Sequence, residues 1–242
     1  MRIVVISATS AIARACIARW AESGAHEFVL VGRSKERLKS TEADLALRFA
    51  SSKFSSLVLS FDSVTEIQKF AETISKQTVD LVLVAQGSLT DQSKASSNLE
   101  YLKSELELNA ISATLFTEAM ANLLEKQGRG TLGVIGSVAG DRGRAYNYSY
   151  GASKALLATY VQGLQQRFAA TEVRVCLIKP GPTATPMTAT HRGRMAEPMD
   201  VAKVIVAGLA KGQRVIYAPT LWRLIMLVVR SIPFAIFKRL NF

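Results

Sequence analysis

The chain has 242 residues, of which 49% are hydrophobic, and a formal net charge of +11 at pH 7. This size and composition favour one soluble domain with a large core. The two cysteines, Cys16 and Cys176, lie far apart within apolar patterns, so we expect core residues rather than a disulfide or a metal site. Met1 leads directly into an apolar strand pattern with no signal-peptide pattern, so we expect no export and a reducing cytoplasm.

Apolar runs alternate with helical patterns along the chain. Strands are expected at 3–6, 28–31, 57–59, 81–84, 132–135, 173–178 and 215–217. Helices are expected at 11–23, 35–50, 64–77, 101–126, 150–170 and 198–211. The alternation predicts right-handed crossovers and an α/β fold: a doubly wound, seven-stranded parallel sheet of the Rossmann type with helices on both faces. We expect one domain over 1–220 and a basic, apolar C-terminal extension over 221–242.

A tyrosine, a lysine and a serine point to carbonyl chemistry. Tyr150 and Lys154 are four residues apart, so they lie on one face of a helix. A neighbouring ammonium favours the phenolate and is expected to lower the pKa of the tyrosine from about 10, towards general acid–base catalysis. Ser137 ends a strand pattern, at the edge where parallel sheets bind ligands. A hydroxyl that holds a carbonyl oxygen and a phenol that protonates it predict a carbonyl-reduction site beside a hydride donor.

The surrounding residues strengthen this interpretation. Ser137 precedes Tyr150 by thirteen residues, Asn109 lies farther upstream, and Pro180-Gly181 follows the next strand. From Arg2 to about Met187, the arrangement resembles the short-chain dehydrogenase/reductase family.

The resemblance implies a catalytic set and a role for each member. The set is Asn109, Ser137, Tyr150 and Lys154. Lys154 would also hold the nicotinamide ribose, and Asn109 would hold a water for proton relay. Tyr146 and Tyr148 are alternative proton donors, but neither has a lysine four residues later.

The loop after the first predicted strand departs from the family pattern. The resemblance implies a glycine-rich turn around the cofactor pyrophosphate, yet Ser7, Ala11 and Ala13 occupy the three glycine positions. The helix that follows still offers its N-terminal amides to an anion. The predicted cofactor contacts in this loop are Ser7, Thr9, Ser10, Ala11 and Ile12. The departure bears on cofactor affinity more than on cofactor identity.

The end of the second predicted strand indicates which dinucleotide binds. Gly32 stands where an acidic residue would accept the ribose hydroxyls of NAD, and Arg33 offers a cationic fork suited to a 2′-phosphate. This pattern predicts NADP(H) in preference to NAD(H), although Arg33 also fits the solvated start of a helix. Asp62 resembles the family's aspartate that holds the adenine amino group, and it equally fits an N-cap position.

Two later loops complete the predicted cofactor site. After the fourth strand, Gly87 matches the family and Ala85 replaces its usual asparagine. After the sixth strand, the predicted contacts near the nicotinamide are Pro180, Gly181, Thr183 and Thr185. An ordinary Pro/Gly loop is the alternative for this turn. His191 falls in the segment where the family carries its variable substrate lid, and we expect a surface or lid residue there rather than a catalyst.

The C-terminal segment is basic and apolar. After Asp200 the chain has no acidic residue and seven basic ones, which are Lys203, Lys211, Arg214, Arg223, Arg230, Lys238 and Arg239. The longest unbroken apolar run, 224–229, is far shorter than the about 18 residues that indicate a spanning helix. The segment fits a membrane interface, and it equally fits packing on the domain or across a subunit interface. No motif supports nucleic-acid binding.

The end of the chain, 218–240, is also loosely similar to reductases that act on a decaprenylphosphoryl-2-keto-pentose. The sequence thus predicts an NADP-dependent oxidoreductase that interconverts a carbonyl and an alcohol, on a small substrate that is amphiphilic or lipid-linked. We expect a cytoplasmic homo-oligomer, at the inner face of the membrane if the tail binds lipid. Two other classes stay open: a catalytically weak dinucleotide-binding scaffold, and a membrane-surface interaction protein.

Overall fold

The computed structural model describes residues 1–189 and 193–240 and contains one parallel sheet. Its strands are β1 (Arg2–Ile6), β2 (Glu27–Gly32), β3 (Lys53–Val58), β4 (Leu81–Val84), β5 (Arg129–Ile135), β6 (Glu172–Pro180) and β7 (Val215–Ala218). They are ordered β3-β2-β1-β4-β5-β6-β7, and every neighbouring pair is parallel. The expected α/β class and the doubly wound, seven-stranded sheet are confirmed.

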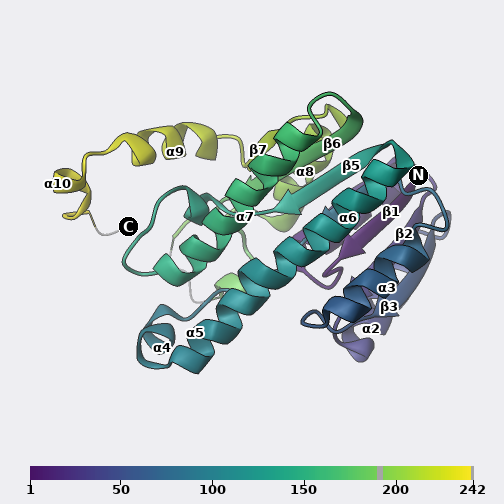
Figure 1. Cartoon of the computed structure of the whole chain (residues 1–242), viewed down its shortest axis with the longest axis horizontal. Coiled ribbons are helices and arrows are strands. Elements are labelled where there is room, and N and C mark those ends of the chain that lie inside the picture. The colour runs from purple at the N-terminus through teal and green to yellow at the C-terminus, as the bar shows by residue number, and fades with distance from the viewer. Residues whose placement is uncertain (190–192, 241–242) are drawn as a thin grey trace.

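Helices cover both faces of the sheet (Figure 1). They are α1 (Ala11–Ser23), α2 (Lys35–Arg48), α3 (Val64–Ile74), α4 (Gln92–Ser97), α5 (Leu99–Leu106), α6 (Ala113–Gln127), α7 (Tyr148–Arg167), α8 (Pro198–Ala210), α9 (Trp222–Ser231) and α10 (Phe234–Phe237). A π-helical segment, η1 (Glu107–Ser112), lies between α5 and α6, and two 3₁₀ turns are η2 (Val138–Asp141) and η3 (Pro186–Thr188).

Alternation along the strands divides the core in two. In β1, Val4 and Ile6 belong to the cluster under α3, α6 and α7, whereas Ile3 and Val5 belong to the cluster with α1 and α8. Successive side chains point to opposite faces of a strand, and a sheet covered on both faces buries them all. Cys16 and Cys176 are free and buried in the second cluster, as expected.

Two elements differ from the expected ones. β3 begins at Lys53 rather than at 57, because it is an edge strand whose polar first half is only partly buried and shows no apolar run. The single helix expected over 101–126 is divided into α5, η1 and α6, and the short helix α4 precedes it.

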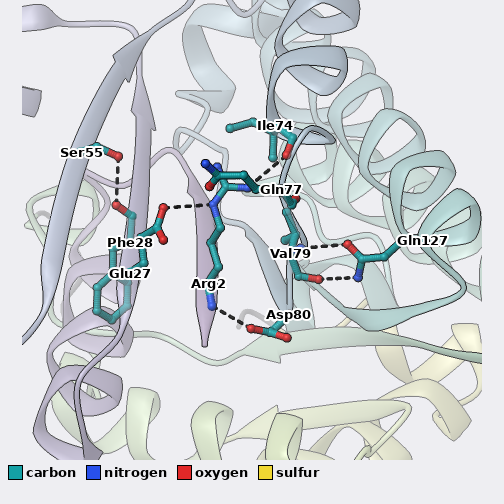
Figure 2. A network of polar contacts seen from close by, with 9 residues as sticks. All are labelled: Arg2, Glu27, Phe28, Ser55, Ile74, Gln77, Val79, Asp80 and Gln127. Atoms are coloured by element: carbon teal, nitrogen blue, oxygen red, sulfur yellow. Dashed lines mark hydrogen bonds and ion pairs between the residues drawn. The ribbon is translucent and has the colours of Figure 1, made fainter.

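A polar network holds the amino ends of the strands together, opposite the edge with the predicted site (Figure 2). The Arg2 amide donates to Asp80, and its guanidinium donates to Glu27 and to the carbonyl oxygens of Ile74 and Gln77. The Gln127 side chain exchanges two hydrogen bonds of 2.8 Å with the backbone of Val79. These contacts join β1, β2, α3 and α6 at the base of the sheet.

Candidate functional site

The four predicted catalytic residues gather at the carboxyl ends of β4 and β5. Ser137 follows β5, Tyr150 and Lys154 lie on α7, and Asn109 lies in η1. Lys154 and Asn109 are both buried. A Cβ built on Gly87, just after β4, would lie 3.0 Å from Lys154 Nζ and 3.1 Å from Asn109 Oδ1. The two side chains therefore flank one backbone position, which only glycine fills because its φ is also +153°.

Ser137 and Tyr150 lie near each other, and the Ser137 hydroxyl acts to lower the pKa of Tyr150. The Ser137 hydroxyl also accepts a 3.1 Å hydrogen bond from the Ala139 amide, which begins η2. Tyr150 lies in the first turn of α7, where the packing of η2 against the helix brings the two groups together.

The alternative tyrosines are placed elsewhere. Tyr148 is 49% exposed, and its hydroxyl lies 3.0 Å from Ser96 Oγ on α4. Tyr146 is also exposed and accepts a hydrogen bond from Arg144. Tyr150 is thus the tyrosine that pairs with Ser137.

Lys154 is held by backbone oxygen atoms. Its Nζ donates to the carbonyl oxygen of Gln86 at 2.9 Å and to that of Ile135 at 3.3 Å. These carbonyl groups lie at the ends of β4 and β5, so the ammonium bridges the two central strands. Nζ lies 5.8 Å from the centroid of the Tyr150 ring.

The net pKa shift of Tyr150 is upward rather than the expected lowering. Burial raises the pKa of Tyr150 from its ordinary value of 10.0 to about 12, and the hydrogen bond with Ser137 opposes that rise only in part. Burial also lowers the pKa of Lys154 from 10.5 to about 8. Loss of solvation dominates both shifts, because Lys154 is buried, Tyr150 is partly buried, and the ammonium is turned towards the strand carbonyls.

A carboxylate that the sequence analysis missed positions Asn109. Glu105 Oε2 accepts hydrogen bonds from Asn109 Nδ2 at 3.3 Å, Ser88 Oγ at 2.7 Å and Thr90 Oγ1 at 2.9 Å. Asn109 Oδ1 in turn accepts from the Ser88 amide at 2.8 Å. The spacing of Glu105 and Asn109, four residues apart, could have predicted this pair.

The π-helical segment η1 contains Asn109. Such segments interrupt α-helices frequently at functional sites. The wider turn lies where Asn109 reaches the loop after β4, and Ser112 at its end accepts from Gln86 Nε2 at 2.8 Å. No residue type in this segment marks the change of helical pitch.

The loop after β1, which the sequence predicts to bind the cofactor phosphates, contains no glycine and has one residue in the left-handed region. Ser7 adopts a φ of +64°, in the left-handed region that glycine occupies at least cost. Ser10 flanks α1 and makes no side-chain capping bond to its first turn within the described residues. Those first-turn amides form an anion-binding terminus that a pyrophosphate fits. Thr9, Ala11 and Ile12 lie in the same turn, partly exposed.

Arg33 and Asp62 line one cavity, of about 700 Å³, between the ends of β2 and β3 and the segment η1. The Arg33 guanidinium lies 5.6 Å from the centroid of the Phe61 ring. A hydrogen bond from Ser60 and, to a smaller extent, the charge of Arg33 lower the pKa of Asp62. A side chain suited to phosphate and a carboxylate suited to an adenine amino group therefore share this space.

The loop after β6 lies beneath the C-terminal segment. Thr183 Oγ1 donates to the Gly181 carbonyl oxygen, and Thr188 Oγ1 donates to the Thr185 carbonyl oxygen. A Cβ built on Gly181 would lie 2.0 Å from Trp222 Nε1, so the indole of α9 occupies the space above this glycine. Pro180 and Ala85 are buried in their strand ends. His191 lies outside the described residues.

One face of α9 packs on the domain. Met226 and Val229 are buried against Val138 of η2, and Trp222 and Ile225 pack beside them. The packing interpretation of the tail therefore holds for this face. None of the helices in the described ranges is long and apolar enough to cross a membrane.

Comparison with known proteins identifies the family of the chain. The family model of short chain dehydrogenases matches residues 1–196. The chain belongs to the short-chain dehydrogenase family. An uncharacterized oxidoreductase of Streptomyces coelicolor is 32% identical to it over 248 residues, which cover 98% of this chain and 95% of the relative. Carbonyl reductase family member 4 of Danio rerio is 33% identical over 84% of this chain and 88% of its own.

Solved short-chain dehydrogenases share the fold. A short chain dehydrogenase from Burkholderia cenocepacia, in complex with NADP, has a TM-score of 0.84 at 19% identity and covers 100% of this chain and 97% of its own. An enzyme from Sphingobium yanoikuyae, in complex with NADPH, has a TM-score of 0.82 at 21% identity and covers 97% of this chain and 98% of its own. By its family match and its oxidoreductase relative, the protein is an NAD(P)-dependent oxidoreductase of this family.

Proposed function

We propose that this short-chain dehydrogenase reduces a carbonyl to an alcohol, or catalyses the reverse reaction, with Tyr150 as acid and base. The observation that carries the proposal is the placement of Ser137 and Tyr150, brought together by the packing of η2 on α7, beside the buried ammonium of Lys154, whose Nζ lies 5.8 Å from the centroid of the Tyr150 ring. When bound, the nicotinamide cofactor supplies the hydride. Ser137 donates a hydrogen bond to the substrate oxygen, and Tyr150 gives it a proton.

Lys154 and Asn109 stabilise the charge on Tyr150 and position the water that returns its proton. Lys154 stabilises the phenolate that Tyr150 leaves, and it offers donors to the nicotinamide ribose. Asn109, oriented by Glu105 and Ser88, orders a water beside Lys154 for return of the proton. The acid–base step contributes about 10²–10⁴-fold to the rate.

NADP(H) is the proposed cofactor in preference to NAD(H). Arg33 is exposed at the end of β2 and lines the cavity that also contains Asp62. Its guanidinium suits a 2′-phosphate. The relative in Danio rerio is a carbonyl reductase, and two structural neighbours bind NADP or NADPH, which supports the choice.

We further propose an amphiphilic or lipid-linked substrate. Trp222 and α9 adjoin the loop after β6, and the outer face of α9 is apolar. A homo-oligomer in the cytoplasm and a C-terminal extension from residue 221 belong to the same proposal.

Replacement of Tyr150 by phenylalanine tests the reaction. Tyr150→Phe removes one hydroxyl, so we expect carbonyl reduction to fall by about 10²-fold or more while NADPH binding and the melting temperature stay close to wild type. Steady-state reduction of a panel of ketones, with a thermal shift in NADPH, measures both. Tyr148→Phe is the matched control and should keep full turnover.

Two results would count against this assignment. Retention of more than about a tenth of turnover by Tyr150→Phe would assign the acid to another group. NADPH binding without reduction of any carbonyl by the wild-type protein would favour a dinucleotide-binding scaffold.

A further inference from the structure

The outer face of α9 is apolar and exposed. Leu221, just before the helix, and Leu224, Leu227 and Val228 within it are each 63% exposed, on the side opposite the buried Met226 and Val229. On α10, Phe234 is 73% exposed and Ile236 is 55% exposed. We call these six residues the tail face. The four residues of the α9 segment share one face by their spacing, and contiguous apolar surface of this kind marks an interaction site.

Contacts with Arg142 hold the two helices that bear the tail face in place. Arg142 Nη1 donates hydrogen bonds of 2.6 Å to the carbonyl oxygens of Val229 and Ile232, which end α9. The Arg142 guanidinium also lies 3.7 Å from the centroid of the Phe237 ring on α10. Both helices are therefore attached to η2, and their outer side chains stay exposed because the inner ones already fill the contact.

The charges on the tail itself all have one sign. Arg223, Lys238 and Arg239 are exposed, and no acidic residue follows Asp200. Arg223 and Arg230 are seven residues apart and lie on one flank of α9, between its buried and exposed faces. Long basic side chains at such a boundary extend along apolar surface and place their charges at its rim.

We propose that α9 and α10 dock this protein on the surface of an anionic lipid bilayer, with the tail face in the acyl boundary and the basic residues at the lipid phosphates. An apolar face bordered by cations and containing an aromatic side chain is the pattern of an interfacial helix. A second copy of the chain fits less well, because two identical tails would bring like charges together. The proposal concerns the tail and does not depend on the reaction.

Docking in this way would orient the site. In Figure 1, α9 and α10 lie at the end of the molecule towards which the strands run. That edge bears Ser137 and the first turn of α7. A bilayer under the tail face would thus lie beside the catalytic edge rather than beside the Arg2 network at the opposite end.

Co-sedimentation with vesicles tests the proposal. At low salt, we expect the full chain to sediment with vesicles of phosphatidylcholine and phosphatidylglycerol in equal parts, and to stay in the supernatant with phosphatidylcholine alone. Added salt should release it, because screening shortens the range of attraction. The double change Leu224→Gln and Leu227→Gln should lose most of the binding.

Matched variants distinguish specific binding through the tail face from non-specific hydrophobic or electrostatic binding. Leu47→Gln removes a leucine that is 85% exposed on α2 and should bind like wild type. Lys238→Glu with Arg239→Glu should lose binding, whereas Lys76→Glu with Lys126→Glu makes the same charge change elsewhere and should not. Circular dichroism verifies that each variant is folded.

Three outcomes would overturn the proposal. The full chain could stay in the supernatant with the anionic vesicles, or Leu47→Gln could weaken binding as much as the tail variants. The third outcome is an oligomer in lipid-free buffer that Leu224→Gln with Leu227→Gln dissociates, without vesicle binding by the wild type. That result would assign the tail face to contacts between copies of this chain.

Discussion

At the scale of single residues, burial governs the chemistry of the Tyr150–Lys154 pair. It raises the pKa of the phenol to about 12 and lowers that of the ammonium to about 8. The phenol is therefore protonated at neutral pH, which suits an acid in reduction, while the lysine is the group that titrates nearest to neutrality. The reverse reaction needs the phenolate and is opposed by the same burial.

The pH dependence of reduction follows from the lysine. Its lowered pKa means that the charge is present below about pH 8 and is lost as the pH rises through that value. Since the charge stabilises the phenolate in the proposed mechanism, kcat/KM for reduction should be constant below about pH 8 and decline above it. Initial rates at low ketone concentration measure the profile. A flat profile across this value would separate the lysine charge from the proton transfer.

Arg33 decides the cofactor in our interpretation. Arg33→Ala should weaken NADPH binding by about 1.5–3 kcal/mol, because a charged hydrogen bond to the 2′-phosphate is lost, and should leave NADH binding nearly unchanged. Fluorescence titration with both cofactors measures the difference. Lys35→Ala, at the exposed start of the neighbouring helix α2, is the control. An equal loss for both cofactors would remove Arg33 from phosphate recognition.

At the scale of elements, the short segments η1 and η2 position two of the predicted catalytic residues. η2 presents Ser137 to Tyr150 and supports α9, so one four-residue turn joins the catalytic edge to the tail. η1 turns Asn109 towards the loop after β4. Apolar periodicity predicted the long helices around these segments but not the segments themselves, because their shape follows from contacts with other parts of the chain.

Substitutions on the two faces of α9 should change the free energy of unfolding by different amounts. Met226 is fully buried, so Met226→Ala should destabilise the protein by about 2 kcal/mol, at the low end for buried methionine because the cluster is small. In a chain of this size that lowers the melting temperature by about 4–8 °C. Leu227→Ala, at 63% exposure, should melt like wild type. Differential scanning calorimetry compares them. Equal stability of both variants would mean that α9 is not packed on η2 in solution.

At the scale of the whole molecule, the stabilising Arg2 network and the predicted active site lie at opposite ends of the strands. The Arg2 network ties the amino ends of the strands, while the carboxyl ends bear the predicted catalytic residues, the cofactor loops and the tail. Parallel strands bring all their carboxyl ends to one edge, so residues from Ser7 to Thr185 converge although they are distant in the chain.

The sequence by itself determined the class of fold, through the alternation of strand and helix patterns. It also predicted the set Asn109, Ser137, Tyr150 and Lys154, through their spacing and the resemblance to the family. The class of fold depends on local periodicity, which the chain carries in every segment. Only the tertiary structure showed that β3 begins at its polar residues and that a π-helical turn contains Asn109. Only the tertiary structure showed that Glu105 holds Asn109 through a hydrogen bond. It also decided the direction of the pKa shifts and the two-faced packing of α9. Each of these depends on burial and on partners from distant segments, which no local pattern records.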